Sequence, residues 1–225
     1  MQQAFKRILK GLQALVVPLV VLGVHQCALA SNCPDLYPFG KPVVIKGSTE
    51  LCNRFYVSLY DANNKAVLAV SERLYPNAPK VKRLSTFRPD SRVGKASATN
   101  SDYTRSGYDR GHMAPAGDAS TNDEMYSTFF FTNMIPQNPV LNRGEWAHLE
   151  EKVRKGIKDD TWVLNIAVYG AEPKRIGSGI PVPKGYWKIV YTAKGTKYFY
   201  AENTAISMVQ SVQYVDVDTV LKGLP

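Results

Sequence analysis

Short runs in which apolar and polar residues alternate predict antiparallel strands. Such a run places one face in the core and the other toward water, with a period of two residues. Turn sequences such as Asp61-Ala62-Asn63-Asn64 and Ala193-Lys194-Gly195 separate pairs of runs, as in hairpins. The expected strands are residues 54–60 with 66–70, residues 162–171, and residues 186–192 with 198–202.

The middle of the chain carries two different patterns. Thr128 to Met134 is an apolar run long enough for a buried strand. From Asn142 to about Lys158, apolar residues recur at helical spacing and predict an amphipathic helix. Asn142 stands where an N-cap residue would stand, with Glu145 three residues later as in a capping box. A helix-start role is therefore the plain explanation of Asn142 considered alone.

The remaining segments complete an α+β fold. Residues 75–108 lack periodicity and form a long connection, which in a compact domain tends to be functional. A helical turn is expected within residues 118–126 and a short terminal helix within residues 216–224. The expected architecture is a central antiparallel sheet with helices packed on it.

The first 30 residues have the pattern of a secretory leader. Cationic residues precede an apolar run, and Ala28-Leu29-Ala30 has the small-x-small pattern found before a cleavage site. The run is too short and too interrupted for a spanning helix, so no stable membrane partner is expected. We therefore expect a signal peptide over residues 1–30, a single domain over residues 31–225, and a periplasmic or secreted location.

Cleavage of the leader leaves two cysteines, Cys33 and Cys52. In an exported chain they most simply form a disulfide, which ties the N-terminus to the first strand. Closing a loop of this length would stabilise the folded state by roughly 3 kcal/mol. A zinc site is not expected, because the sequence has no Cys-x-x-Cys pair.

The chain is basic, with 28 Lys and Arg against 19 Asp and Glu, a net charge of +9. Three of the cations belong to the leader, so the remaining domain carries 25 against 19, or +6. Such a charge by itself is compatible with unspecific adhesion to polyanions. Here, however, the cations gather upstream of residue 110, where they could neutralise phosphates and make binding weaken with salt. They are Lys80, Lys82, Arg83, Arg88, Arg92, Lys95 and Arg105.

The densest concentration of chemistry is Asp109-Arg110-Gly111-His112-Met113-Ala114-Pro115. Outside the leader only His112 and His148 remain as imidazoles, and an unperturbed imidazole has a pKa near 6.5. His112 is therefore the better candidate for a proton acceptor at neutral pH.

Three segments together carry a family resemblance. They are Asp109 to Pro115, then Thr132-Asn133-Met134-Ile135-Pro136-Gln137, then Leu141-Asn142-Arg143-Gly144-x-Trp146-x-x-Leu149-Glu150. In this order and spacing the chain resembles, from about Leu51 to Tyr200, the DNA/RNA non-specific endonucleases of the ββα-metal (His-Me finger) superfamily. The resemblance implies a Mg²⁺-dependent endonuclease, with Mn²⁺ as an alternative ion, that cuts DNA and RNA to 5′-phosphate products through contacts with the phosphate backbone.

The resemblance also implies roles for individual residues. His112 would be the general base, with its other ring nitrogen held by a backbone carbonyl. Asn142 would be the metal ligand, because Mg²⁺ prefers oxygen ligands and keeps most of its waters. Glu150 would hold a metal-bound water, and Arg110 would stabilise the phosphate.

Other positions stay open at this stage. One upstream arginine, Arg83 or Arg88, would contact the phosphate. Asn133 and Gln137 match polar positions that border the family's site, although hydrogen bonding at the strand end explains them equally well. Asp109 is expected to pin the strand or an arginine. A homodimer is compatible with the sequence and not required by it.

Two other functions compete with the nuclease. A non-catalytic protein that captures extracellular nucleic acid could keep the same scaffold, although every motif position is filled. An enzyme acting on another phosphodiester, such as a phospholipid headgroup, is the other alternative, and the cationic connection favours nucleic acid over it.

Overall fold

The computed structural model describes residues 30–224, and the account below concerns the compact unit that begins at Ser31. The expected leader, apart from Ala30, lies outside the described residues. Within residues 30–224, no helix has both the length and the apolar character needed to cross a membrane.

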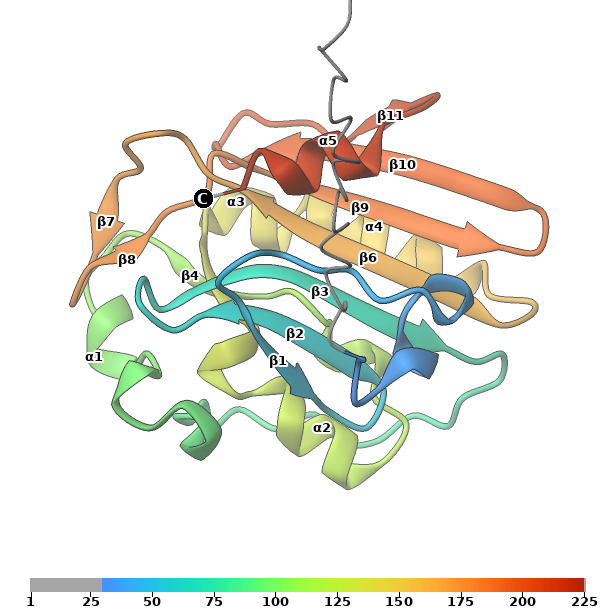
Figure 1. The fold of residues 1–225 in the computed structure, drawn as a ribbon, viewed down its shortest axis with the longest axis horizontal. Helices are drawn as coiled ribbons and strands as arrows, with labels where there is room; N and C mark the ends of the chain where they lie inside the picture. The colour runs from blue at the N-terminus through green and yellow to red at the C-terminus, as the bar shows by residue number, and fades with distance from the viewer. Residues whose placement is uncertain (1–29, 225) are drawn as a thin grey trace, which may run out of the picture. The chain divides into compact units, whose positions relative to one another are not determined.

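A seven-stranded antiparallel sheet forms the centre of the fold, in the order β1-β2-β3-β6-β9-β10-β11 (Figure 1). The strands predicted from alternation are confirmed, and β3 runs four residues longer than expected because its pairing with β6 continues to Leu74. The strands are β1 (Thr49–Cys52), β2 (Tyr56–Asp61), β3 (Ala66–Leu74), β6 (Thr161–Val168), β9 (Gly185–Thr192), β10 (Gly195–Glu202) and β11 (Gln210–Val212).

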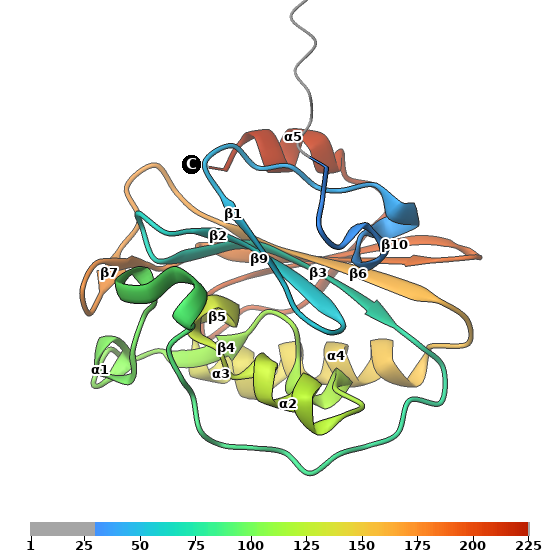
Figure 2. The same cartoon turned by 60° about the horizontal axis from the view of Figure 1, so that its bottom comes forward.

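The two faces of this sheet carry different elements (Figure 2). One face carries the terminal helix α5 (Val217–Lys222) and the N-terminal segment. The other carries a small two-stranded ribbon, β4 (Asp109–His112) with β5 (Met134–Gln137), and the remaining helices. These helices are α1 (Asn100–Tyr103), α2 (Asn122–Thr128), α3 (Pro139–Arg143) and α4 (Glu145–Lys155). A minor hairpin, β7 (Arg175–Ile176) with β8 (Ile180–Pro181), lies outside the main sheet.

The strand predicted over residues 128–134 is wrong. Helix α2 ends at Thr128, a 3₁₀ turn covers Phe131–Asn133, and the strand begins only at Met134. The run is apolar because Phe129 and Phe131 are both buried, each about 1% exposed, in two different core clusters. Here an irregular backbone buries the two side chains in different clusters, and the apolar pattern does not distinguish it from a strand buried on both faces.

The single helix predicted from Asn142 is also wrong, because the chain forms two helices that meet at Gly144. Asn138 caps α3 by accepting a hydrogen bond from the backbone N–H of Val140, and Pro139 occupies the first turn. A Cβ atom at residue 144 would lie 2.7 Å from the carbonyl oxygen of Val140, closer than a side chain allows. Asn142 therefore belongs to the last turn of α3 and does not cap α4.

The core between the sheet and α4 contains buried charges. Trp146 and Leu149 of α4 are buried, as their helical spacing predicts. Beneath them Lys188 is only 1% exposed; its ammonium donates to Asn165 at 2.6 Å, and Asn165 donates to the buried Glu72 at 3.1 Å. A buried cation is tolerated when it is hydrogen-bonded in this way.

An N-terminal clasp, defined here as Ser31, Asn32, Tyr37 and Glu50 with the Cys33–Cys52 disulfide, fastens the start of the domain to β1. The disulfide is present as predicted, with the two Cα atoms 6.0 Å apart. Glu50 accepts hydrogen bonds from Ser31 Oγ at 2.7 Å, from the backbone of Asn32 at 3.0 Å and from Tyr37 OH at 2.8 Å. Burial raises the pKa of Glu50, but these hydrogen bonds outweigh it and leave the pKa below its ordinary value.

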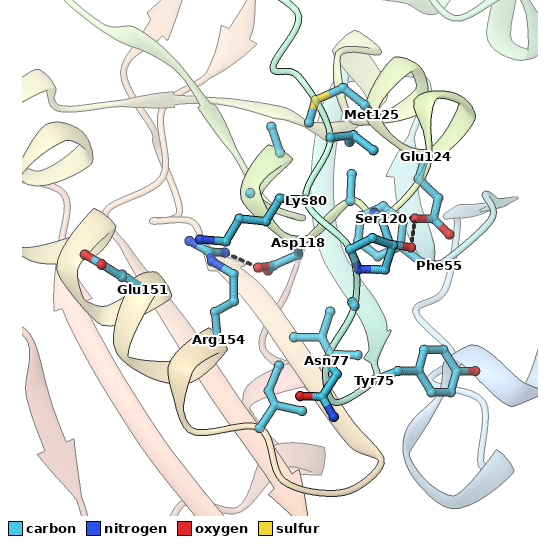
Figure 3. Close-up of a pocket in the computed structure, with 18 of the residues that line it drawn as sticks. Phe55, Tyr75, Asn77, Lys80, Asp118, Ser120, Glu124, Met125, Glu151 and Arg154 are labelled. Carbon is cyan, nitrogen blue, oxygen red and sulfur yellow. Dashed lines mark hydrogen bonds and ion pairs between the residues drawn. The ribbon is translucent and has the colours of Figure 1, made fainter.

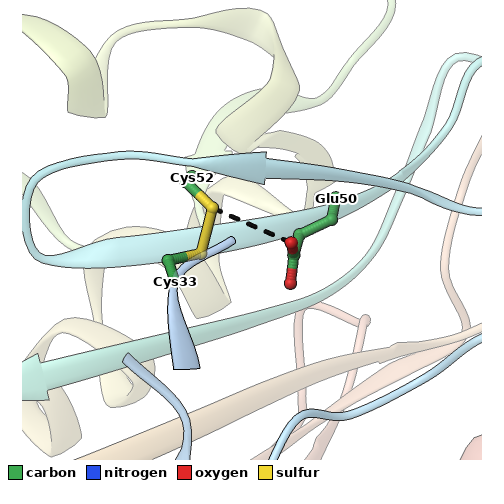
Figure 4. Close-up of side chains that lie close together, drawn as sticks. All are labelled: Cys33, Glu50 and Cys52. Atoms are coloured by element: carbon green, nitrogen blue, oxygen red, sulfur yellow. Dashed lines mark hydrogen bonds between the residues drawn. A yellow bond between two sulfur atoms is a disulfide. The ribbon is translucent and has the colours of Figure 1, made fainter. Parts of the chain in front are cut away.

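Cys33, Glu50 and Cys52 lie close together (Figure 4), and elsewhere such a group could hold a metal. Here both sulfurs are engaged in the disulfide, so neither is a thiolate ligand. The grouping is structural.

Candidate active site

His112 lies at the end of β4, paired with Met134 of β5. Its ring packs against two aromatic rings, with centroid distances of 5.0 Å to Phe129 and 5.7 Å to Phe87. The expected hydrogen bond from a ring N–H to a backbone carbonyl is not formed with any residue that the structure describes. Nε2 is buried and has no hydrogen-bond partner within residues 30–224. The ring is therefore positioned by aromatic packing.

The surroundings of His112 keep its imidazole neutral. Burial lowers the pKa of His112, the Arg83 charge lowers it further, and the result is about 3. At neutral pH the ring therefore carries no extra proton and can accept one. An anionic phosphate beside the ring would favour the charged imidazolium and so raise this pKa in the presence of substrate.

Asn142 reaches the same place from the last turn of α3. Its Nδ2 donates to Asp109 Oδ2 at 2.8 Å, which fixes the orientation of the carboxamide. Asp109 also accepts from Arg143, at 2.8 Å from Nε and 2.6 Å from Nη2. Asp109 thus pins an arginine, as expected, but it is Arg143. The Asn142 side-chain oxygen accepts no hydrogen bond from any described residue, so it stays available as a ligand.

Glu150 enters the site from α4. No described residue forms a hydrogen bond or ion pair with its carboxylate. Burial raises the pKa of Glu150, the Lys188 charge opposes this shift, and the result is about 7. The charged form of this carboxylate is costly, because burial outweighs the attraction of the neighbouring cations.

These groups line one cavity of about 460 Å³. Its walls bring together His112, Asn142 and Glu150 from three separate elements. Five of its lining side chains either carry a positive charge or can acquire one by protonation. Apart from His112, the cationic lining residues are Arg83, Arg110, Arg143 and Arg154. A concave site with convergent polar groups and perturbed pKa values is typical of an active site.

The structure separates the upstream arginines. Arg83 lines the cavity, and its guanidinium lies 5.4 Å from the Phe129 ring centroid. Arg88 is not among the lining residues; its guanidinium lies 3.6 Å over the Tyr126 ring and donates to the Tyr126 and Thr86 carbonyls. Arg110 lies at the cavity, stacks over Phe87 at 4.4 Å and donates to Asn100 at 2.9 Å.

Asn133 and Gln137 do not line the cavity, since both are completely buried. Asn133 braces the turn after His112: its side chain donates to the carbonyls of Ala114 and Thr128 and accepts from the Ala114 N–H at 2.8 Å. Gln137 packs against Gly111, where any larger residue would overlap it, and within residues 30–224 its amide makes no hydrogen bond. Both residues act on the site through the backbone that carries His112.

Arg154 is a site residue that the sequence analysis missed. It lines the cavity from α4, one turn after Glu150, and forms an ion pair with the nearly buried Asp118. The spacing of four residues puts Arg154 on the same helix face as Glu150, which is a signal the sequence offered. The partner Asp118 is distant in sequence and gave no such signal.

The sequence profile of the DNA/RNA non-specific endonucleases matches residues 35–222. The chain belongs to this family. A structure titled as the EndoG/EndoGI complex, which concerns EndoG inhibition, shows the same fold with a TM-score of 0.72, covering 88% of this chain and 94% of that one at 24% identity. The family assignment agrees with the resemblance carried by the three motifs.

Individual relatives match over different lengths. Nuclease C1 of Cunninghamella echinulata is 31% identical over 190 residues, 75% of each chain. A nuclease of Nostoc sp. is 39% identical over 48% of this chain, and human mitochondrial endonuclease G is 36% identical over 53% of it. In each of the latter two the match spans 41% of the relative, less than half of its length.

The family is metal-dependent, and the residues of this site fit a hard divalent cation. The Asn142 oxygen and the Glu150 carboxylate are both oxygen donors without a partner in the described part of the chain. Oxygen donors with room for water suit Mg²⁺ or Mn²⁺ better than a softer metal. Asn142 would be the direct ligand, and Glu150 would hold a water of the ion.

Proposed function

We propose that this protein is an exported, Mg²⁺-dependent endonuclease that hydrolyses phosphodiester linkages of DNA and RNA and leaves 5′-phosphates. The observation that carries the proposal is that one cavity lined by arginines brings together His112 Nε2, the side-chain oxygen of Asn142 and the carboxylate of Glu150, none of which has a hydrogen-bond partner within residues 30–224. The family membership supports it. Export is supported by the leader-like sequence before Ser31 and by the Cys33–Cys52 disulfide.

In the proposed reaction, a water oxygen attacks phosphorus while the bond from phosphorus to the 3′ oxygen breaks, and the 3′ oxygen leaves as a hydroxyl by taking a proton from solvent water. His112 takes the proton from the water, and its neutral state at physiological pH makes it ready to do so. Arg83 and Arg110 offset the charge that builds on the phosphate oxygens. The cation, when bound, supplies Lewis-acid stabilisation of the same charge.

The same cavity supports cleavage without sequence preference. Its cationic side chains meet phosphate, which every nucleotide shares, and phosphate contacts carry no base information. We therefore expect cleavage of DNA and of RNA at comparable sites.

A plasmid-nicking assay tests the activity. Supercoiled DNA and a labelled RNA are each incubated with the protein and Mg²⁺, and with the protein in excess EDTA. We expect both substrates to be cut only with Mg²⁺, with 5′-phosphate ends on the products. Binding without cutting would overturn the proposal in favour of a nucleic-acid-capturing protein, and cutting in EDTA would overturn the metal dependence.

A further inference from the structure

A second cavity adjoins the active site. It measures about 630 Å³, which is within the range of about 300–1,000 Å³ typical of ligand pockets. It shares five lining residues with the active-site cavity, so the two spaces lie on either side of the same residues. The shared residues are Arg83, Ala116, Gly117, Ala147 and Arg154.

One wall of this cavity is a strap, defined here as residues 75–86, which follows β3. The strap faces α4 and the segment before α2, and Figure 3 shows Lys80 on the strap and Arg154 on α4 pointing toward each other. Within the described chain, residues 79–86 make no backbone-to-backbone hydrogen bond, so the strap is held by side-chain contacts such as that of Arg83 with the Phe129 ring. The width of the cavity can therefore adjust to a ligand.

The floor of the cavity is apolar. Phe55, Leu74 and Met125 are each 5% exposed or less, and Ile157 adds a half-buried surface. Tyr75 stands at the rim with about half of its surface exposed. A flat, weakly polar group such as a nucleobase is suited to a floor of this kind.

The rim carries positive charge that the protein does not neutralise. Five cationic and three acidic side chains line the cavity, and Arg73 pairs with Asp160 outside it at 2.5 Å, which leaves a net charge of +1. The acids are engaged: Asp118 pairs with Arg154, Glu151 pairs with Lys155 at 2.6 Å, and Glu124 accepts hydrogen bonds from Ser120. Lys80 forms no hydrogen bond or ion pair with any described residue. Its ammonium is free to meet an anion.

We propose that this cavity binds one unpaired nucleotide of the substrate strand, next to the linkage that is cleaved, with the base on the apolar floor and a phosphate at Lys80. The inference rests on the proposed function, because the wall shared with the active-site cavity is what identifies the ligand as part of the same strand. It adds a binding subsite outside the three sequence motifs.

Binding to a fluorescent single-stranded DNA 12-mer tests whether Lys80 contacts a phosphate. Anisotropy is measured in EDTA over a range of salt for the wild type, Lys80→Ala and Lys82→Ala. Lys82 is the matched control, since it is an exposed cation on the same strap that lines neither cavity. We expect Lys80→Ala to raise Kd about five-fold and to reduce the slope of log Kd against log salt by about 0.7, as for one lost phosphate contact to a single strand. Lys82→Ala should change both much less.

A 12-mer made of abasic nucleotides tests whether a base binds to the apolar floor of the cavity. We expect the wild type to bind it at least about five-fold more weakly than the normal 12-mer, because stacking of one base contributes about 1–3 kcal/mol. Ala78→Trp, which fills the cavity from the strap, should remove most of this difference. Thermal melting confirms that each variant is folded.

Equal effects of Lys80→Ala and Lys82→Ala would overturn the subsite, because the strap would then act only as diffuse charge. Equal affinity of the wild type for the two 12-mers would overturn the base-binding floor. Neither outcome touches the nuclease activity, which is measured separately with Mg²⁺. Conversely, a wild type that binds as expected but cuts nothing would contradict the proposed function alone.

Discussion

Glu50 and Glu150 are both carboxylates partly shielded from water, and the domain treats them in opposite ways. In the N-terminal clasp, Glu50 accepts hydrogen bonds from three residues, and its pKa lies below the ordinary value. In the active-site cavity, Glu150 has no protein partner within residues 30–224, and its pKa is raised to about 7. A satisfied carboxylate stabilises the fold, whereas an unsatisfied one stores an unfavourable free energy that a ligand can relieve.

The same contrast extends to the neighbours of each carboxylate. Around Glu50, the two cysteines form a disulfide and the hydroxyl of Tyr37 donates to the carboxylate, so these groups are engaged with one another. Around Glu150, His112 Nε2 and the Asn142 oxygen are also without partners in the described structure. The comparison predicts that substitutions in the cavity change activity and spare stability, and that substitutions in the clasp do the reverse.

The largest expected effect comes from His112→Ala. It removes the group that takes the proton, so kcat/KM on DNA should fall about 10²-fold or more. His148→Ala, an exposed imidazole on α4, is the matched control and should leave kcat/KM unchanged. Full activity in a folded His112→Ala protein would show that the ring is not the base.

Asn142→Ala should follow closely, with a loss of about 10²-fold at fixed Mg²⁺. The side-chain oxygen is the only direct ligand we assign, so the Mg²⁺ concentration for half-maximal activity should also rise. Asp109 keeps its contacts to Arg143, which limits the structural damage. An unchanged Mg²⁺ titration with reduced kcat would instead mean that Asn142 only orients neighbouring groups.

Glu150→Gln should cost about 10–100-fold in activity, as for a residue that holds a ligand's water. Because protonated glutamate resembles glutamine in charge, the difference between wild type and variant should narrow as pH falls below about 7. A bound cation favours the charged carboxylate and moves this window to lower pH. Profiles of kcat/KM against pH for both proteins measure it, and parallel profiles would contradict the role of the charge.

Glu50→Gln should have the smallest effect on activity and a clear effect on stability. Loss of hydrogen bonds to a charged group costs about 2 kcal/mol, or about 4–8 °C in Tm for a domain of this size. The folded-state pKa is lowered, so the stabilisation is complete above the ordinary carboxylate pKa near 4.5 and is lost as pH falls through the lower folded value. The Tm difference between wild type and variant should therefore close in acid. A constant difference would mean that packing, not charge, holds the clasp.

The sequence alone predicts the strands of the sheet and the residues of the site to different extents. Hairpins with alternating residues were predictable, because the period of a half-buried strand is local information. The apolar run at Phe129 and Phe131 was not, since two separate clusters bury its side chains. The spacing of the motifs identified His112, Asn142 and Glu150, but the role of Arg154 depends on Asp118, which only the fold brings near.

Asn142 shows why local rules failed where they did. Its position before Glu145 fits a capping box, yet Asn138-Pro139 is the pair that begins the helix. The predicted helix start rests only on the first of these signals, and the structure shows that the second begins the helix and that the chain bends at Gly144. The difference matters for function. A capping Asn142 would use its side-chain oxygen to accept a backbone N–H, whereas in the structure its Nδ2 donates to Asp109 and its oxygen is left unbonded by the described residues.

Gly144 contributes no functional group, yet the direction of two functional side chains depends on it. With a continuous helix, Asn142 and Glu150 would be eight residues apart on one rigid cylinder, more than two turns along its axis. The bend that Gly144 permits lets the two oxygens approach a common point from different directions. A screen for inactive variants of this chain should therefore recover Gly144→Ala together with substitutions of the proposed catalytic side chains.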